Sequence, residues 1–141
     1  MGTSIGGSSV VGNDVRFLDD PGGLKAWQLQ GFCEGWVRPL SSEELLRVVQ
    51  GSAHVVLAQD AASGRVVGFI TAVTDGVFAA YIPLLEVLRP FRKRGIGTRL
   101  VSLMLEKLRD YRMVDLMCDE GLVGFYRRFG LRPMGGMGLR R

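Results

Sequence analysis

Arg92-Lys93-Arg94-Gly95-Ile96-Gly97 is a basic turn with two glycines, and it stands between an apolar run and a segment with helical periodicity. The first turn of a helix offers backbone N–H groups without intrahelical partners and carries a partial positive charge. The two glycines leave room for a pyrophosphate to approach the backbone, and the three basic side chains attract it. The turn therefore predicts a binding site for a ligand that carries a pyrophosphate.

Other phosphate-binding motifs fit this turn less well. A Walker loop requires Gly-Lys-Ser/Thr after four spacer residues, and the chain has no such pattern. A dinucleotide fingerprint requires a third glycine three residues after Gly97, where the chain has Leu100. A basic helix start without any ligand is the alternative that the turn alone leaves open, and the elements around it argue against that alternative.

The elements around the turn predict a strand–helix–strand unit. Gly97–Leu108 has apolar residues four positions apart, which indicates a helix with one buried face. Val77–Leu88 before the turn and Val114–Cys118 after the helix are predicted strands, the second of them buried, and a helical crossover makes the two parallel. Pro83 lies inside the first strand and has no N–H for a ladder bond, so we expect a bulge or a break in pairing there.

The remaining segments predict an antiparallel meander before this unit and short elements around it. A capping box formed by Ser41 and Glu44 starts a helix that ends at Gly51. Leu24–Trp36 predicts another helix, weakened by two glycines. The other predicted elements are strands at Val15–Leu18, His54–Gln59, Arg65–Val73 and Leu131–Met134, and a helix at Leu122–Phe129 closed by Gly130.

Composition places the chain among ordinary globular proteins. It has 141 residues, of which 47% are hydrophobic, and a net charge of +4, which suits one domain and an anionic ligand. We expect residues 13–141 to form a single domain and residues 1–12 to form a flexible tail. Two cysteines and one histidine argue against a zinc site, so no metal is expected. No transmembrane run or signal peptide is visible, which predicts a cytoplasmic location.

With these motifs in place, the chain resembles the GNAT superfamily of N-acetyltransferases. The family signature Arg/Gln-x-x-Gly-x-Gly/Ala, at the start of the central helix, corresponds to Arg92, Gly95 and Gly97. Leu85–Arg92 looks like the strand that leads into that turn. Phe125–Leu131 is similar to the family's Phe-Tyr-x-x-x-Gly-Phe segment near the C-terminus. The three segments at this spacing are stronger evidence than the six-residue turn alone.

The resemblance implies an α/β (α+β) fold with a GNAT-like mixed, mostly antiparallel central sheet, one parallel βαβ pair and flanking helices. It also implies acetyl-CoA as co-substrate and a small-molecule or peptide amine as acceptor. Backbone N–H groups of the turn would hold the pyrophosphate, and main-chain groups near Val87 would pair with the pantetheine arm like an added strand. The residues implied for coenzyme A binding are Val87, Leu88, Arg92, Lys93, Arg94, Gly95, Ile96, Gly97 and Thr98.

Two residues are candidates for the chemical step. Tyr126 matches the family's tyrosine, which implies a proton donor to the departing thiolate, and a reference pKa near 10 keeps its hydroxyl protonated. Glu86 is the only charge in the strand Val77–Leu88, and a carboxylate there needs a partner, water or a function. We take it as a candidate base or amine-binding group. The alternatives are a tyrosine packed in the core and a carboxylate paired with a nearby arginine.

Several other assignments stay open at this stage. Asp119 and Glu120 are predicted to cap the last helix, with the lining of a site at the end of the strand as the alternative. Cys118 is predicted to be a small core residue, with a covalent acyl-cysteine as the alternative. Trp36 is expected in the core, with the wall of an acceptor pocket as the alternative. A coenzyme A-binding regulatory module without catalysis is the second functional hypothesis. A specific nucleic-acid binder is disfavoured, because a charge of +4 predicts only non-specific, salt-dependent binding. The oligomeric state, a homodimer included, is open.

Overall fold

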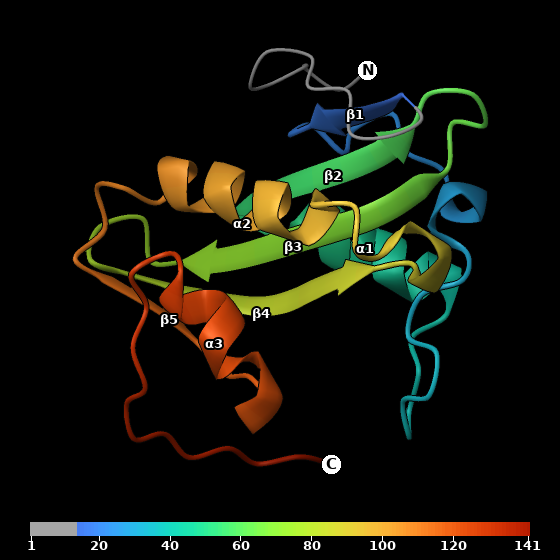
Figure 1. Ribbon diagram of the computed structural model, residues 1–141. Helices are drawn as coiled ribbons and strands as arrows, with labels where there is room; N and C mark the ends of the chain where they lie inside the picture. The colour runs from blue at the N-terminus through green and yellow to red at the C-terminus, as the bar shows by residue number, and fades with distance from the viewer. Residues whose placement is uncertain (1–13) are drawn as a thin grey trace.

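The computed structural model describes residues 14–141, so the expected tail at 1–12 lies outside the described residues. Five strands form one sheet in the order β1-β2-β3-β4-β5 (Figure 1). Their bounds are Val15–Leu18, His54–Asp60, Val66–Thr74, Ala79–Val87 and Met113–Leu116. The first four strands pair antiparallel, and β4 pairs with β5 in parallel, which confirms the predicted mixed sheet.

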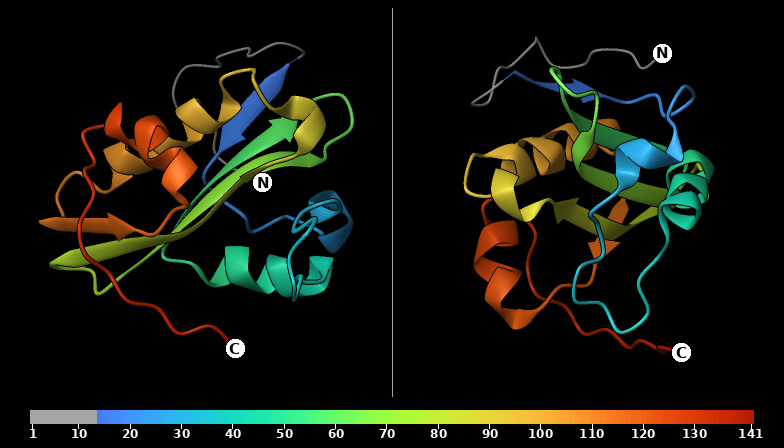
Figure 2. Two further views of the ribbon diagram at one scale, coloured as in Figure 1. Left: turned by 60° about the horizontal axis from the view of Figure 1, so that its bottom comes forward. Right: turned by 90° about the vertical axis from the view of Figure 1, so that its right-hand side faces the viewer.

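Helices cover both faces of this sheet. The helix α2 (Ile96–Lys107) crosses one face over β2 and β3, while α1 (Ser42–Gly51) and the short 3-10 helix η1 (Ala26–Leu29) lie on the opposite face (Figure 2). α3 (Val123–Arg127) follows β5 and lies on the same side as α2. Two further 3-10 turns, η2 and η3, span Arg89–Phe91 and Glu120–Leu122. The buried side chains fill the space between the sheet and these two helical layers.

A glycine in β3 brings α2 close to the sheet. A Cβ atom at Gly68 would lie 3.2 Å from side-chain atoms of Ile96 and Leu100 and 3.3 Å from Val87, which is too close for normal packing. The start of α2 is therefore seated directly on β3 and beside the end of β4. This contact fixes the direction of the first turn of α2. It is possible only because residue 68 has no side chain.

The helix α1 begins as its sequence predicts. The N–H of Glu44 donates to Ser41 Oγ at 3.1 Å, and the N–H of Ser41 donates to Glu44 Oε1 at 3.0 Å. These two bonds complete the capping box and satisfy donors that a helix start leaves open. Leu45 and Val49 lie on one face of the helix and are buried in the core.

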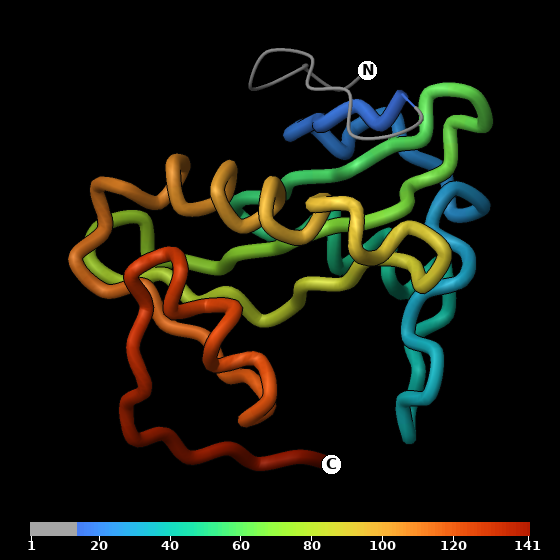
Figure 3. Tube along the Cα trace, in the orientation of Figure 1, coloured from blue at the N-terminus to red at the C-terminus, as the bar shows by residue number. Residues whose placement is uncertain are grey.

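The predicted helix over Leu24–Trp36 is wrong. Only the 3-10 turn Ala26–Leu29 forms, and an irregular segment follows it up to α1. The reason is a series of left-handed residues, with φ of 96° at Gly31, 65° at Cys33 and 82° at Gly35. Left-handed residues cannot continue a right-handed helix. The tube in Figure 3 follows this segment as a long excursion beside α1.

Two expectations about the C-terminal part also need correction. The strand predicted as buried over Val114–Cys118 is β5, which ends at Leu116 and alternates between exposed and half-buried residues, because it is an edge strand with one partner. Leu131–Met134 forms no strand. Pro133 removes a ladder donor there. The segment 131–141 instead runs from α3 toward the side of the sheet that carries α1 (Figures 1 and 2).

The distortion predicted at Pro83 is present. The pairing of β3 with β4 shifts between Thr71, which is opposite Leu84, and Val73, which is opposite Tyr81. Two residues of β4, Ile82 and Pro83, thus stand against one residue of β3, which is the pattern of a β-bulge. The bulge bends β4 at the point where its parallel partner ends.

Candidate active site

The second half of β4 has an open edge. β5 ends at Leu116, opposite Ile82, while β4 continues to Val87. The N–H of Leu88 donates to Val67 of β3 at 2.8 Å, so alternation turns the N–H and C=O groups of Val87 and Leu85 away from β3, toward the open edge. Pro83 falls on the same side by alternation, so its missing N–H costs no ladder bond.

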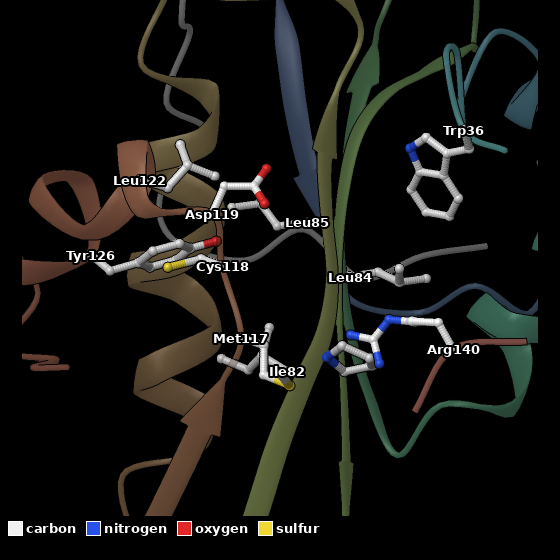
Figure 4. Close-up of a pocket in the computed structure, with 11 residues that line it drawn as sticks. Trp36, Ile82, Leu84, Leu85, Met117, Cys118, Asp119, Leu122, Tyr126 and Arg140 are labelled. Atoms are coloured by element: carbon white, nitrogen blue, oxygen red, sulfur yellow. The ribbon is translucent and has the colours of Figure 1, made fainter. Parts of the chain in front are cut away.

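A cavity of about 390 Å³ lies at this open edge (Figure 4). Its lining comes from the bulged part of β4, the residues after β5, the C-terminal helix and two irregular segments. These residues are 82–85, Met117–Asp119, Leu122, Tyr126, Trp36 and Arg140. Segments that are about a hundred positions apart in the sequence therefore meet at one place, which is where the sheet separates.

The cavity has two sides, because successive residues of β4 face opposite ways. We call them the helix side and the loop side. On the helix side, Leu85 faces Leu122 and Tyr126; on the loop side, Leu84 faces Trp36 and Arg140 (Figure 4). The cavity thus passes the edge of β4 and is accessible to groups from both faces of the sheet.

The basic turn leads from β4 into the helix side. Gly95 precedes the first residue of α2 with a left-handed backbone, φ 81°, and Lys93 is also left-handed, with φ 62°. Left-handed residues in a turn gather consecutive N–H groups into a concave anion site. A Cβ atom on Gly95 would meet no atom within 4 Å, so the space in front of this backbone is open.

Two of the three basic side chains of the turn have local contacts. Arg92 Nε donates to the carbonyl of Val87 at 2.9 Å, which ties the turn to the end of β4. Arg94 stacks over the ring of Phe91, with 5.1 Å between the guanidinium carbon and the ring centroid. These contacts position the turn, and its backbone N–H groups are the donors best placed for an anion.

Tyr126 lies on α3 and is buried, with 8% of its surface exposed. The ring of Phe125 packs against its ring edge to face, at 5.0 Å, and the hydroxyl points toward β4 (Figure 4). Burial raises the pKa of the Tyr126 hydroxyl, and the negative charge of Cys118 in its thiolate form raises it further. The hydroxyl is therefore protonated at neutral pH and is a hydrogen-bond donor to the cavity.

Glu86 faces the loop side but does not line the cavity. Both of its carboxylate oxygens accept the N–H of Cys33, at 3.1 and 3.0 Å. Burial raises the pKa of the Glu86 carboxyl, and this effect outweighs the Cys33 hydrogen bond and the charge of Arg92, which lower it. The carboxylate thus holds the left-handed Cys33 against β4, next to the irregular segment that carries Trp36.

Comparisons with known proteins agree with this geometry. The model of the acetyltransferase (GNAT) family matches residues 23–131. This chain belongs to the GNAT acetyltransferase family. A crystal structure of a putative acetyltransferase from Deinococcus radiodurans R1 is 44% identical and superposes with a TM-score of 0.87, covering 91% of this chain and 89% of that one.

More distant relatives point the same way. A GNAT-family acetyltransferase from Streptococcus pneumoniae TIGR4 is 26% identical, with a TM-score of 0.71 over 90% of this chain and 98% of that one. A protein from Porphyra purpurea named uncharacterized N-acetyltransferase ycf52 is 24% identical over 119 residues, which cover 81% of this chain and 68% of that protein. Membership of this family makes the protein an acyltransferase. Within residues 14–141, no helix is both long and apolar enough to span a membrane.

The structure of this acetyltransferase changes several assignments made from sequence. Cys118 is exposed and lines the cavity, so it is not a core residue. Asp119 lines the cavity too, and its side chain makes no capping hydrogen bond, so the capping role is wrong. Trp36 is 41% exposed and lines the cavity, which favours the alternative role. Leu88 turns its N–H to β3, so the open-edge donors belong to Val87 and Leu85.

One cationic residue near the turn was missed as a candidate for the site. Arg128 Nη2 donates to Thr98 Oγ1 at 2.8 Å, and its guanidinium lies over the rings of Phe125 and Phe129. It therefore adds a positive charge to the first turn of α2 from 30 positions away in the sequence. No local sequence pattern predicts this contact, because it depends on how α3 packs beside α2.

Proposed function

We propose that this acetyltransferase moves an acetyl group from acetyl-CoA to a primary amine, by direct attack within a ternary complex. The observation that carries the proposal is the cavity at the open edge of β4, which has a helix side and a loop side. A donor on the helix side and an acceptor on the loop side would meet next to Tyr126. Direct transfer needs such a meeting point, because both substrates must be bound together.

The donor fits the helix side through main-chain groups. The N–H groups from Lys93 to Thr98 would hold the pyrophosphate at the start of α2, where the turn is concave and its front is open. The open-edge groups of Val87 and Leu85 would pair with the amides of the pantetheine arm, as an added strand does. Arg92 uses one of the two lone pairs of the Val87 carbonyl, so the other remains for such pairing.

Tyr126 would serve as the proton donor when the thiolate leaves. A thiol has a reference pKa of about 8.5, so protonation helps it depart at neutral pH. Tyr126 carries its proton at that pH because burial raises its pKa. Its hydroxyl points at the edge of β4, where the thioester of a strand-like pantetheine arm would lie.

The amine must lose a proton before or during attack. An alkyl amine with a pKa of about 10.4 is neutral in roughly one molecule in 10³ at pH 7, which corresponds to about 4–5 kcal/mol. Glu86 is the candidate that removes this proton through water or binds the ammonium group, because its pKa is raised and it faces the loop side. Its hydrogen bonds to Cys33 give it a positioning role as well.

The direct test is a thioester assay with a panel of primary amines and acetyl-CoA. The proposal expects amine-dependent release of coenzyme A, together with binding of coenzyme A measured by calorimetry. Binding without turnover across the panel would favour a regulatory coenzyme A-binding module instead. Absence of coenzyme A binding would contradict the proposal that acetyl-CoA is the acetyl donor.

A further inference from the structure

The charged residues that line the cavity are divided between its two sides, with a positive charge on the loop side and a negative charge on the helix side. Arg140 lines it, and none of the ion pairs formed among residues 14–141 includes this residue. The one acidic residue in the lining, Asp119, lies on the helix side with Tyr126 (Figure 4). Trp36 lies on the same side of β4 as Arg140, with Leu84 between them in Figure 4, and 41% of its surface is exposed. A partly exposed indole and an arginine free of ion pairs are thus the two distinctive groups on that side.

The backbone that carries Arg140 is shaped to bring its side chain back toward the cavity. A Cβ atom on Gly138 would lie 2.9 Å from Arg140 Nη1 and 3.4 Å from the terminal methyl of Met117. Gly138 therefore leaves the space through which the guanidinium folds back beside Met117, another residue of the lining. Within residues 14–141, the Arg140 guanidinium donates a single hydrogen bond, a long one of 3.4 Å to the carbonyl of Leu139, which leaves most of its N–H donors for a ligand or water.

The Arg140 guanidinium and the Trp36 indole would favour some amines over others according to charge. An alkyl ammonium ion approaching the loop side meets the positive charge of Arg140 in the lining itself, whereas the Glu86 carboxylate faces the same side from outside the lining, so a simple cationic amine is disfavoured at the position of Arg140. An amine that also carries an anionic group would place that group on the guanidinium, whose planar donors suit a carboxylate. An apolar frame between the two groups would pack against Trp36 and Leu84, which line the same side.

We propose that the acceptor is a primary amine with an anionic group, such as a carboxylate, on an apolar frame, and that Arg140 binds the anion while Trp36 covers the frame. This inference rests on the proposed transfer to an amine and adds the chemical class of the acceptor. Arg140 is a specificity residue in this arrangement, and it takes no part in the proton transfers.

The test compares two amines that differ only in charge far from the amine. 4-(Aminomethyl)benzoate and 4-(aminomethyl)benzamide share ring and amine, so the ratio of their kcat/KM values isolates recognition of the anion. The wild-type ratio should fall about tenfold in Arg140→Ala, because a charge-assisted bond is lost at a partly exposed site. Arg141 is the neighbouring residue and does not line the cavity, so Arg141→Ala removes an equal charge and should keep the wild-type ratio.

Gly138→Ala tests the same residue without deleting it. The added methyl group would displace the flexible end of the guanidinium, so this variant should also lower the benzoate preference while its melting temperature stays close to that of the wild type. An equal ratio in wild type and Arg140→Ala would overturn the inference.

A binding measurement separates this inference from the proposed function. Calorimetry in the presence of coenzyme A should show tighter binding of the benzoate than of the benzamide, with the difference lost in Arg140→Ala. If that difference is found but no amine is acetylated, amine transfer is wrong and anion recognition stands. If both amines are acetylated but bind equally well, amine transfer stands and the inference is overturned.

Discussion

The helix side of the cavity comes mainly from regular structure, whereas the loop side comes mainly from irregular chain. The helix side is lined by Leu85 of β4, Leu122 of η3 and Tyr126 of α3, and it shares its face of the sheet with the turn at 92–97 and α2, which follow β4 in the sequence. The loop side is formed around Leu84 by the segment after η1 and by residues 131–141, which have few hydrogen bonds to the sheet. The proposed donor site would therefore be fixed by backbone, and the proposed acceptor site by a handful of side-chain contacts.

This difference has a functional meaning for a GNAT acetyltransferase. A shared co-substrate needs the same backbone cradle in every member, while acceptors differ and can be accommodated by loops that the scaffold does not constrain. Under the proposed function, changes on the helix side should alter coenzyme A binding, and changes on the loop side should alter the choice of amine.

The largest effect is expected from Gly95→Glu. A carboxylate in front of the first turn of α2 would occupy the open space and repel the pyrophosphate, so affinity for acetyl-CoA should fall about a hundredfold, which corresponds to about 2.7 kcal/mol. Calorimetric titration with coenzyme A measures this. Gly95→Ala is the control, because it adds only left-handed strain of about 1 kcal/mol to unfolding. A titration of Gly95→Glu that matched the wild type would rule out this turn as the donor site.

Tyr126→Phe should lower kcat by about a hundredfold, because general acid catalysis contributes at least that much. The ring and its packing against Phe125 are kept, so the affinity for coenzyme A should stay nearly constant. Single-turnover measurements with a reactive amine would check the chemical step. An unchanged rate for that step would show that the hydroxyl does not protonate the thiolate.

Arg128→Ala should weaken coenzyme A binding by a few-fold and reduce its dependence on salt. The guanidinium lies next to Thr98 at the start of α2 but is exposed, so screening by salt limits its contribution. Arg127→Ala removes the neighbouring exposed charge and serves as the matched control. Equal salt dependence in both variants would mean that Arg128 contributes only general surface charge.

The smallest effect is expected from Glu86→Gln, and it depends on pH. The pKa of Glu86 is raised in the folded chain, so the folded state holds its proton more tightly than the unfolded state does. The resulting stability is present at low pH and is lost as pH rises through the folded pKa. The variant should therefore gain stability relative to wild type between pH 4 and pH 7, as seen in melting temperatures. A constant difference across this range would contradict the raised pKa.

The same variant separates the roles open to Glu86. If the carboxylate removes the proton of the amine, Glu86→Gln should lower kcat and remove the acidic limb of the pH–rate profile. If it only holds Cys33, the glutamine oxygen can still accept that N–H, and the profile should keep its shape.

The sequence predicts the helix side much better than the loop side, and the reason is physical. The turn at 92–97, the periodicity of α2 and the proline in β4 act through local backbone preferences, which a short window of sequence contains. Trp36, Arg140 and Arg128 reach the site only through tertiary packing, and no local pattern specifies that. The predicted helix at 24–36 failed for a related reason, because Cys33 adopts a left-handed backbone where Glu86, 53 positions away, accepts its N–H.

The open stretch of β4 is also a bare sheet edge, and such edges tend to recruit strands from other chains and so favour aggregation. Pro83 interrupts the row of donors at one end, and at the other end the Arg92 guanidinium takes one of the two lone pairs of the Val87 carbonyl. Between them, roughly 13 Å of extended chain is available, at about 3.3 Å per residue. This length admits a short arm with a few amides and is too small for a longer protein strand. The edge would therefore discriminate by length, and the pantetheine arm proposed to bind there would act as a temporary last strand of the sheet.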